Sequence, residues 1–325
     1  MFFSFKFYTL LMLDINSIYQ KVNKFYETNP NWVVFFVWAT ATGKSGTSIE
    51  VIRKWIDAEV ISSDSRQLYR HMNIWTDKVS QEIMDEIPHH QINILDPDQP
   101  YTAGDWKTET ERLIEEIQWR WKRVFVVWWT GLYTSMLYKN FSMPDAKPDL
   151  EFRKKLEKEE EKEKGILHKK LVEVDPSEAM ILDPRNTRYI IRALEIFEKT
   201  GKPKSEVCRE LPVKWPMLII LLRREKDETN KRINARIKEM VKEWLLEEVQ
   251  WLLDQWYSPK LQAMQGIGYK EIVWHLQGKY NLEDAIELLK RNTHHYAKKQ
   301  RTWFRRYIAD SVNCKEGVLF EVIRL

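Results

Sequence analysis

The run VVFFV, from Val33 to Val37, leads directly into ATATGKS, which ends at Ser45. A continuous apolar run bounded by turn-forming residues is typical of a strand that is buried on both faces of a parallel sheet. ATATGKS keeps the second half of the phosphate-loop pattern G-x-x-x-x-G-K-[ST], and residues 45–55 then have a helical pattern. A strand, a phosphate-binding turn and a helix in this order predict an open α/β sheet.

Further apolar runs support this fold class. AEVISSDS predicts a strand that ends at Asp64, KRVFVV predicts one that ends at Trp128, and PMLIILLRR predicts a later one. A helical pattern over residues 105–121 lies between the first two of these. The alternation predicts a doubly wound parallel sheet like that of P-loop nucleoside triphosphate hydrolases, in which ligands bind beyond the carboxyl ends of the strands. Lys44, Asp64 and Thr130 all fall at such ends.

The composition divides the chain into regions. Residues 144–211 are densely charged while their apolar residues keep helical spacing, and the run EKEEEKEK within them is interpreted as a solvated helix face. We expect a helical insertion there, in an α/β core formed by residues 31–143 and 212–325, with helices at the C-terminal end. Residues 1–30 are expected to be an N-terminal extension. Residues 230–256 predict one long helix with a core-facing apolar side.

Overall charge and cysteine content limit the class of protein. The chain has 52 basic and 48 acidic side chains, a balance too mild for general nucleic-acid binding, so any RNA-facing surface must be local. Cys208 and Cys314 cannot form a zinc site alone and fit a reducing compartment. No apolar run approaches the roughly 18 residues that span a bilayer. We expect a cytoplasmic monomer that does not contact a membrane.

The phosphate-loop segment supplies the first candidate site. Gly43 allows close backbone approach, Lys44 offers a positive charge to phosphate oxygens, and Ser45 offers a hydroxyl to Mg²⁺. In P-loop proteins, including ATP-binding ones, these residue types hold a nucleotide with its magnesium ion. The sequence therefore predicts a phosphorylated ligand and bound Mg²⁺.

Other motifs leave alternatives open. Asp64 is either a helix N-cap or magnesium-shell carboxylate, or a general base beside the phosphate site. The pair Thr130 and Gly131 fits a structural turn as well as a site. His89 and His90 lack a third ligand nearby and are interpreted as loop residues. In HHYAKKQRTWFRR, interleaved basic and aromatic residues suit RNA binding and, nearly as well, a half-buried amphipathic helix.

Several blocks occur in one order along the chain: TATGKS, ISSDSRQLYRHMNI, IPHHQINILDPDQPYTAGDW, TGLY, RYIIRALEIFEKTGK, GIGYKE and YAKKQRTWFRR. From about Val33 to Arg306 the sequence thereby resembles the bacterial tRNA dimethylallyltransferases. The resemblance implies transfer of a dimethylallyl group from dimethylallyl diphosphate to the exocyclic N6 amine of the adenosine 3′-adjacent to the anticodon, assisted by Mg²⁺. The tRNA anticodon loop is the implied partner.

The resemblance also implies roles for individual residues. Asp64 takes the proton from the attacking amine, and Thr130 positions the reactants. The implied diphosphate site consists of Thr40, Ala41, Thr42, Gly43, Lys44 and Ser45, with Ser45 on the metal ion and Arg232 as a further clamp. The implied tRNA contacts are Asp64, Ser65, Arg66, Gln67, Arg153, Arg188, Arg192, Gln265, Gly266, Ile267, Gly268, Tyr269, Lys270 and Glu271.

Tryptophan stands where the resembled family carries glycine. The positions are Trp38, Trp75, Trp121, Trp128, Trp129, Trp244 and Trp256. An indole in a left-handed turn costs roughly 1–2 kcal/mol, and glycine is scarce, at 10 of 325 residues against 15 tryptophans. We hypothesise that the gene encodes these glycines with the codon UGA, as some bacteria do. The printed sequence would then be a translation in which UGA is read as tryptophan.

Two other functions compete with prenyl transfer. A small-molecule kinase could use the same loop and magnesium ion, although it has no need of RNA-facing segments. A related enzyme acting on free adenine nucleotides is disfavoured by the long insertion. An inactive RNA-binding remnant becomes the better interpretation if the tryptophans are the natural residues, because Trp38 then intrudes on the phosphate site.

Overall fold

The structure is a computed structural model, and it describes residues 15–37, 39–55, 57–127, 130–144, 146–310 and 316–324. The chain divides into two compact units. An α/β unit contains the chain up to Tyr138 and from Val213 onward, and a helical unit contains Lys139–Pro212. Within the described ranges, no helix combines the length and the apolar character needed to cross a lipid bilayer.

The α/β unit is built on a sheet in which every pair of neighbouring strands is parallel. Its strands lie in the order β3-β2-β4-β1-β5-β6. They are β1 (Val33–Val37), β2 (Ala58–Ser62), β3 (His89–His90), β4 (Arg123–Val127), β5 (Met217–Arg223) and β6 (Val318–Arg324). All of β1 is inaccessible to solvent, as its unbroken apolar run predicts for a central strand. The predicted fold class is confirmed.

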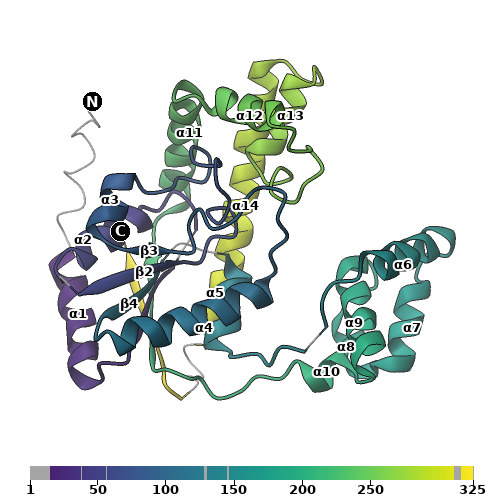
Figure 1. Cartoon of the computed structure of the whole chain (residues 1–325), viewed down its shortest axis with the longest axis horizontal. Helices are drawn as coiled ribbons and strands as arrows, with labels where there is room; N and C mark the ends of the chain where they lie inside the picture. The colour runs from purple at the N-terminus through teal and green to yellow at the C-terminus, as the bar shows by residue number, and fades with distance from the viewer. Residues whose placement is uncertain are drawn as a thin grey trace. The chain divides into compact units, whose positions relative to one another are not determined.

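Helices connect and cover these strands (Figure 1). They are α1 (Ile15–Thr28), α2 (Lys44–Ile52), α3 (Gln81–Glu86), α4 (Ala103–Trp119), α5 (Gly131–Tyr138), α11 (Lys226–Lys242), α12 (Leu245–Asp254), α13 (Tyr269–Leu276) and α14 (Leu282–Asp310). A capping box begins α4: the Thr102 side chain accepts the Asp105 amide, and the Asp105 side chain accepts the Thr102 amide. The predicted helix over residues 105–121 is therefore confirmed, with its end two residues earlier at Trp119.

The described part of the expected N-terminal extension is a helix that packs on the α/β unit. Helix α1 buries Ile18, Val22 and Tyr26 in the core of the α/β unit. The Tyr26 hydroxyl donates to the Val124 carbonyl of β4 at 3.0 Å, and its ring meets Phe125 edge to face. An amphipathic helix must bury its apolar side somewhere, and here the sheet provides the surface. The apolar run at residues 8–13 lies outside the described residues.

The long helix expected over residues 230–256 is wrong. Two helices, α11 and α12, occupy this stretch. The helical backbone is interrupted between them at Trp244, whose φ is +75°. A residue with a left-handed backbone conformation cannot continue a right-handed helix. The backbone therefore turns at this residue, although the apolar periodicity of the sequence continues across it. Strand β6 and the short β3 also have no counterpart in the sequence prediction, and β6 completes the sheet beside β5.

The backbone at several tryptophans is the kind that glycine adopts. Trp121, Trp244 and Trp256 have φ values of +59°, +75° and +66°. These residues are 86%, 68% and 93% exposed, so packing of the indoles does little to offset the backbone strain. Trp75 differs, because its φ is not positive and its indole lies on Gly268, where a Cβ atom would be 2.2 Å from the ring. Trp38, Trp128 and Trp129 lie outside the described residues.

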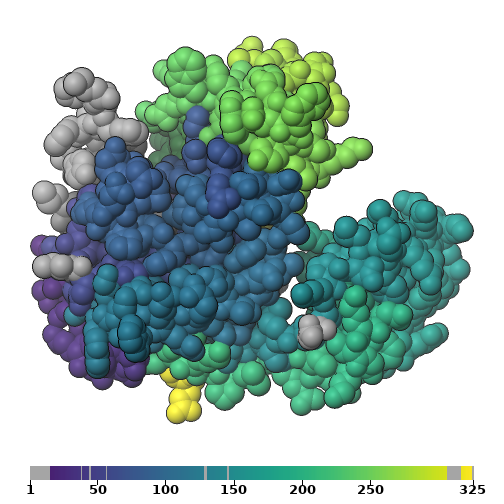
Figure 2. Space-filling view, viewed as in Figure 1, coloured from purple at the N-terminus to yellow at the C-terminus, as the bar shows by residue number. Residues whose placement is uncertain are grey.

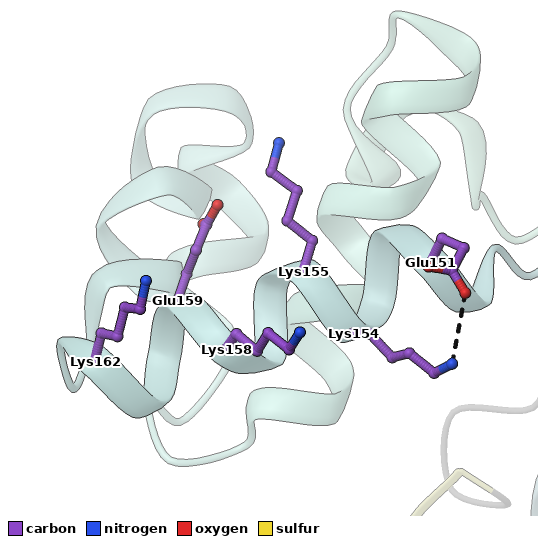
Figure 3. Close-up of a pocket in the computed structure, with 6 residues that line it drawn as sticks. All are labelled: Glu151, Lys154, Lys155, Lys158, Glu159 and Lys162. Atoms are coloured by element: carbon purple, nitrogen blue, oxygen red, sulfur yellow. Dashed lines mark hydrogen bonds and ion pairs between the residues drawn. The ribbon is translucent and has the colours of Figure 1, made fainter.

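The helical unit has its own core. Its elements are α6 (Leu150–Lys162), α7 (Ile166–Val174), α8 (Pro176–Ile181), α9 (Thr187–Thr200) and α10 (Lys204–Val207). Leu156, Leu167 and Leu171 pack against Ile190 and Leu194 of α9. The opposite side of α6 is a charged surface, as expected for a solvated helix face. Figure 3 shows the side chains along it: Glu151, Lys154, Lys155, Lys158, Glu159 and Lys162.

A buried carboxylate joins α6 to α9. Glu195 has no exposed surface, accepts a bidentate pair of hydrogen bonds from Arg153 and a further bond from Arg192, and accepts one from the Asp149 amide at 2.7 Å. Burial by itself raises the pKa of this carboxyl, but these donors outweigh it and lower the pKa to about 2. The charged form of Glu195 therefore stabilises the helical unit.

This ion cluster predicts acid sensitivity. Because the pKa falls from 4.5 in the unfolded chain to about 2 in the folded one, its contribution is complete above pH 4.5 and is lost as the pH falls towards 2. Between pH 7 and pH 3 the free energy of unfolding of the helical unit should drop by about 2 kcal/mol on account of Glu195. Hydrogen exchange of α9 amides across this pH range measures the loss.

The matched variants are Glu195→Gln and Glu198→Gln. Glu195→Gln should lower stability at pH 7 and flatten the pH profile, because the titrating group is gone. Glu198 is exposed on the same helix, so its variant should keep the parent profile. An unchanged acid profile in Glu195→Gln would show that other carboxyl groups cause the acid sensitivity.

Candidate active site

The ATATGKS segment forms a tight loop between β1 and α2. Gly43 adopts φ +93° at the N-cap of α2, and Ala41 adopts φ +59°. The Thr42 hydroxyl donates to the Ala39 carbonyl at 2.9 Å and is fully buried. A left-handed glycine directly before a helix lets successive backbone amides point at a bound anion, which the positive end of the helix favours. The side chain of Lys44 lies outside the described part of the structure.

Two arginines that follow β5 in the chain, Arg224 directly after the strand and Arg232 in α11, contact this loop. Arg232 Nε donates to the Ala41 carbonyl at 2.9 Å, and Arg224 Nε donates to the Thr42 carbonyl at 3.3 Å. Burial lowers the pKa of Arg232, and the positive charge of Arg224 lowers it further, although the group stays charged. Arg224 is buried and forms an ion pair with Glu228, so its charge is largely compensated. The half-buried guanidinium of Arg232, by contrast, lies beside Gly43 and favours an anionic ligand at the loop. The predicted clamp role of Arg232 agrees with this position.

Helix α14 reaches the same loop. The Thr40 amide donates to the side-chain carbonyl of Gln300 at 2.8 Å, across 260 residues of sequence. Gln300 is 4% exposed. Any contact of Thr40 with a diphosphate would therefore use its hydroxyl, because its amide is already engaged. Tyr296, one helical turn before Gln300, lies within electrostatic range of Asp64 and Arg66.

The two predicted catalytic residues come together at the ends of neighbouring strands. Strands β2 and β4 pair Ser62 with Val127, so Asp64 and Thr130 follow at the same edge. The Thr130 amide donates to the Ser63 carbonyl at 2.7 Å, and its hydroxyl accepts the Ser65 amide at 2.9 Å. One oxygen of Asp64 accepts the Arg66 amide at 2.8 Å, an Asx turn that presents the half-buried carboxylate. Asp64 is therefore not a helix N-cap.

The DSRQ block lies against the QGIGYKE block. Arg66 Nη1 donates to the Gln262 carbonyl at 2.6 Å, and a Cβ atom at Gly266 would lie 3.2 Å from Arg66 Nε. Figure 2 shows the blue segment after β2 in contact with the green segment around α12 and α13. Glu248 of α12 adds a second link, because its carboxylate accepts the Asn73 amide at 2.8 Å. Two blocks assigned to tRNA from the sequence thus form one surface.

Within this surface, several residues predicted to contact RNA are buried and form hydrogen bonds inside the protein. Gln67 is buried, accepts from the Ser62 hydroxyl and donates to the Thr76 and Asp77 carbonyls. Tyr269 and Glu271 have no exposed surface, and Glu271 accepts the Gly268 amide at 2.7 Å. These residues hold the shape of the two blocks. Gly266 and Gly268 are buried as well. Five further members of the two blocks are half-buried or exposed: Ser65, Arg66, Gln265, Ile267 and Lys270.

The predicted RNA contacts in the helical unit divide in the same way. Arg153 and Arg192 both bind the buried carboxylate of Glu195, so much of their charge is compensated inside the unit. Arg188 is exposed on α9. Contacts of these three residues with tRNA stay a prediction.

The oxygen donors of the site fit a magnesium ion that is carried by the ligand. Among the described residues, no group of three or more His, Cys, Asp or Glu side chains could hold a metal ion. Mg²⁺ bound to a diphosphate needs only one or two protein oxygens, because phosphate oxygens and water complete its shell. Ser45 in the first turn of α2 and Asp64 after β2 are donors of this kind.

The loop and the strand-end carboxylate define the class. A phosphate loop at the carboxyl edge of a parallel sheet, with Asp64 and Thr130 beside it, is the site of a P-loop-type enzyme that acts on a phosphorylated substrate. The family model for IPP transferase matches residues 67–307. The chain belongs to the IPP transferase family.

Individual relatives agree with this assignment. The tRNA dimethylallyltransferase of Pelotomaculum thermopropionicum is 42% identical over 270 residues, which cover 82% of this chain and 86% of that protein. The crystal structure of the full-length tRNA isopentenylpyrophosphate transferase from Bacillus halodurans superposes with a TM-score of 0.63 at 37% identity, over 90% of each chain. A eukaryotic dimethylallyltransferase acting on tRNA has a TM-score of 0.74 at 28% identity, over 90% of this chain and 73% of the other. The resemblance noted from the sequence is confirmed.

Sequence reasoning missed two residues at the phosphate loop. Arg224 directly follows β5, and Gln300 lies on the buried side of α14 with Ala297 and Phe304. The sequence did contain a signal for Gln300. It is a polar residue three positions after one apolar residue and four positions before another, which places it on the apolar face of a helix. Its partner in the loop could not be known without the fold.

Proposed function

We propose that this protein transfers a dimethylallyl group from dimethylallyl diphosphate to the N6 amine of the tRNA adenosine next to the anticodon. The observation that carries the proposal is the juxtaposition of Asp64 and Thr130 at adjoining strand ends in a member of this family. Family membership favours this reaction over a small-molecule kinase. The anticodon loop suits the chemistry, because a single-stranded adenine can be flipped into an enclosed site.

In the proposed reaction the N6 nitrogen forms a bond to C1 of the dimethylallyl group. The C1–O bond breaks, and diphosphate leaves with the bonding electron pair. Asp64 accepts the proton that the amine loses, which matters because an aromatic amine is a weak nucleophile. Thr130 holds the Ser65 amide and so keeps the turn that presents the carboxylate.

The loop from Thr40 to Ser45 would receive the departing diphosphate. The amides after Thr40, the positive end of α2 and the guanidinium of Arg232 would meet the developing negative charge. A bound Mg²⁺ would supply further neutralisation, with Ser45 as its protein ligand. The residues of the helical unit and the joined DSRQ and QGIGYKE blocks would contact the anticodon arm.

The proposal is tested with the chain in which the seven tryptophans named above are returned to glycine. Incubation with labelled dimethylallyl diphosphate, MgCl₂ and tRNA should place label in the tRNA and release pyrophosphate in equal amount. Absence of label from tRNA in a folded protein would contradict the proposed function. If the tryptophan-bearing chain binds tRNA but not pyrophosphate, that printed form is an RNA-binding remnant.

A further inference from the structure

The phosphate loop is held in a strained shape by groups outside it. Ala41 has φ +59°, which an L-residue adopts only at a cost and keeps only when its surroundings determine it. Arg232 holds the Ala41 carbonyl, and Arg224 holds the Thr42 carbonyl. Both restraints act on the carbonyl side of the loop, downstream of the peptide that leads into Ala41.

The restraint before Ala41 comes from the C-terminal helix. The Gln300 carbonyl oxygen accepts the Thr40 amide at 2.8 Å, so the peptide between Ala39 and Thr40, one residue before the strained one, is fixed as well. The amide assignment follows from this bond, since only the oxygen of Gln300 can accept from Thr40. Gln300 is 4% exposed and sits on a helix whose neighbours Ala297 and Phe304 are fully buried, so its side chain has little freedom.

Helix α14 also reaches the other half of the site. One helical turn before Gln300, the same helix carries the hydroxyl of Tyr296. That hydroxyl is within electrostatic range of Asp64 and Arg66. One helix therefore carries both the glutamine that fixes the loop of the proposed diphosphate site and a tyrosine within electrostatic range of the proposed base.

We propose that Gln300 is a positioning residue that sets the geometry of the diphosphate-binding loop through the Thr40 amide. Amides that must meet charge on a leaving group are effective when they are held in place beforehand, since no reorganisation is then needed during the reaction. This role rests on the proposed function for the identity of the ligand. The loop restraint itself can be measured without any prenyl transfer.

The test uses Gln300→Met, which keeps the length of the side chain and removes the acceptor for the Thr40 amide, and Gln300→Glu, which keeps that acceptor. Thr302→Ala on the exposed side of α14 is the matched control. All variants are made in the glycine-restored chain. The readouts are hydrogen exchange of the Thr40 amide, affinity for inorganic pyrophosphate with MgCl₂, and separate KM values for the prenyl donor and for tRNA.

For Gln300→Met we expect exchange at Thr40 to accelerate about 10-fold, and the pyrophosphate Kd and the donor KM to rise about 10-fold, with the KM for tRNA unchanged. Gln300→Glu should restore slow exchange at Thr40. Exchange and pyrophosphate affinity within about twofold of the parent in a folded Gln300→Met protein would overturn the proposal. If pyrophosphate responds as expected while no label enters tRNA, the positioning role stands and the proposed function fails.

Discussion

Replacing Asp64 by Asn should lower the rate of prenyl transfer by about 10²–10⁴-fold while leaving the fold and the pyrophosphate affinity intact. Asn keeps an oxygen that can accept the Arg66 amide, the bond that Asp64 makes at 2.8 Å, so the turn after β2 is preserved. What Asn cannot do is take a proton from the adenosine amine. The loss should therefore fall on kcat, with little change in either KM.

Single-turnover transfer of labelled dimethylallyl to tRNA measures this effect directly. Asp64→Ala removes both the base and the turn, so its rate should be at or below that of Asp64→Asn, and its stability should be lower. Thr130→Val tests the neighbouring contact, because it deletes the hydroxyl that accepts the Ser65 amide at 2.9 Å. Full transfer by Asp64→Asn would rule out the carboxylate as the base, and Asp64 would then be a residue that shapes the turn.

Returning Trp121, Trp244 and Trp256 to glycine should stabilise the α/β unit by about 3 kcal/mol in total. Each of these residues has a positive φ, and relief of a left-handed L-residue is worth about 1 kcal/mol per position. Their largely exposed indoles lose little buried area on removal. Trp244 and Trp256 lie at opposite ends of α12, so their effects should add.

Trp119→Gly is the matched control for this prediction. Trp119 is 81% exposed and lies two residues before Trp121, but it is the last residue of α4 and its φ is not positive. Its change to glycine should therefore destabilise the chain by about 0.5–1 kcal/mol. Urea unfolding followed by far-ultraviolet circular dichroism reports both changes without relying on indole fluorescence.

The gene itself offers an independent check. UGA codons at these positions would show that the natural chain carries glycine there, and UGG codons would mean that the indoles are natural residues of an impaired site. If Trp121→Gly and Trp119→Gly shift stability equally and in the same direction, backbone strain at residue 121 is not the reason for the glycine preference. The two results together separate the genetic hypothesis from the conformational one.

Local chemistry made much of the fold predictable. An unbroken apolar run is enough to place β1, and a Gly-Lys-Ser triplet after it is enough to place the loop and the start of α2. The break at Trp244 was missed because apolar spacing continues across it, although the glycine of the resembled family at this position was a sign of a turn. Strand β6 was missed because it lies far along the chain from β5, its partner in the sheet.

The active site shows the same division. Sequence by itself determined the family, the phosphate loop and the presence of a carboxylate after β2, since these depend on residue types within short segments. Only the tertiary structure decided that Gln300 holds Thr40, that Arg66 lies on Gly266, and that Glu195 takes up two arginines predicted to face tRNA. Hydrogen-bond partners of buried polar groups depend on which distant segments the folded core brings into contact, and no local pattern records that choice.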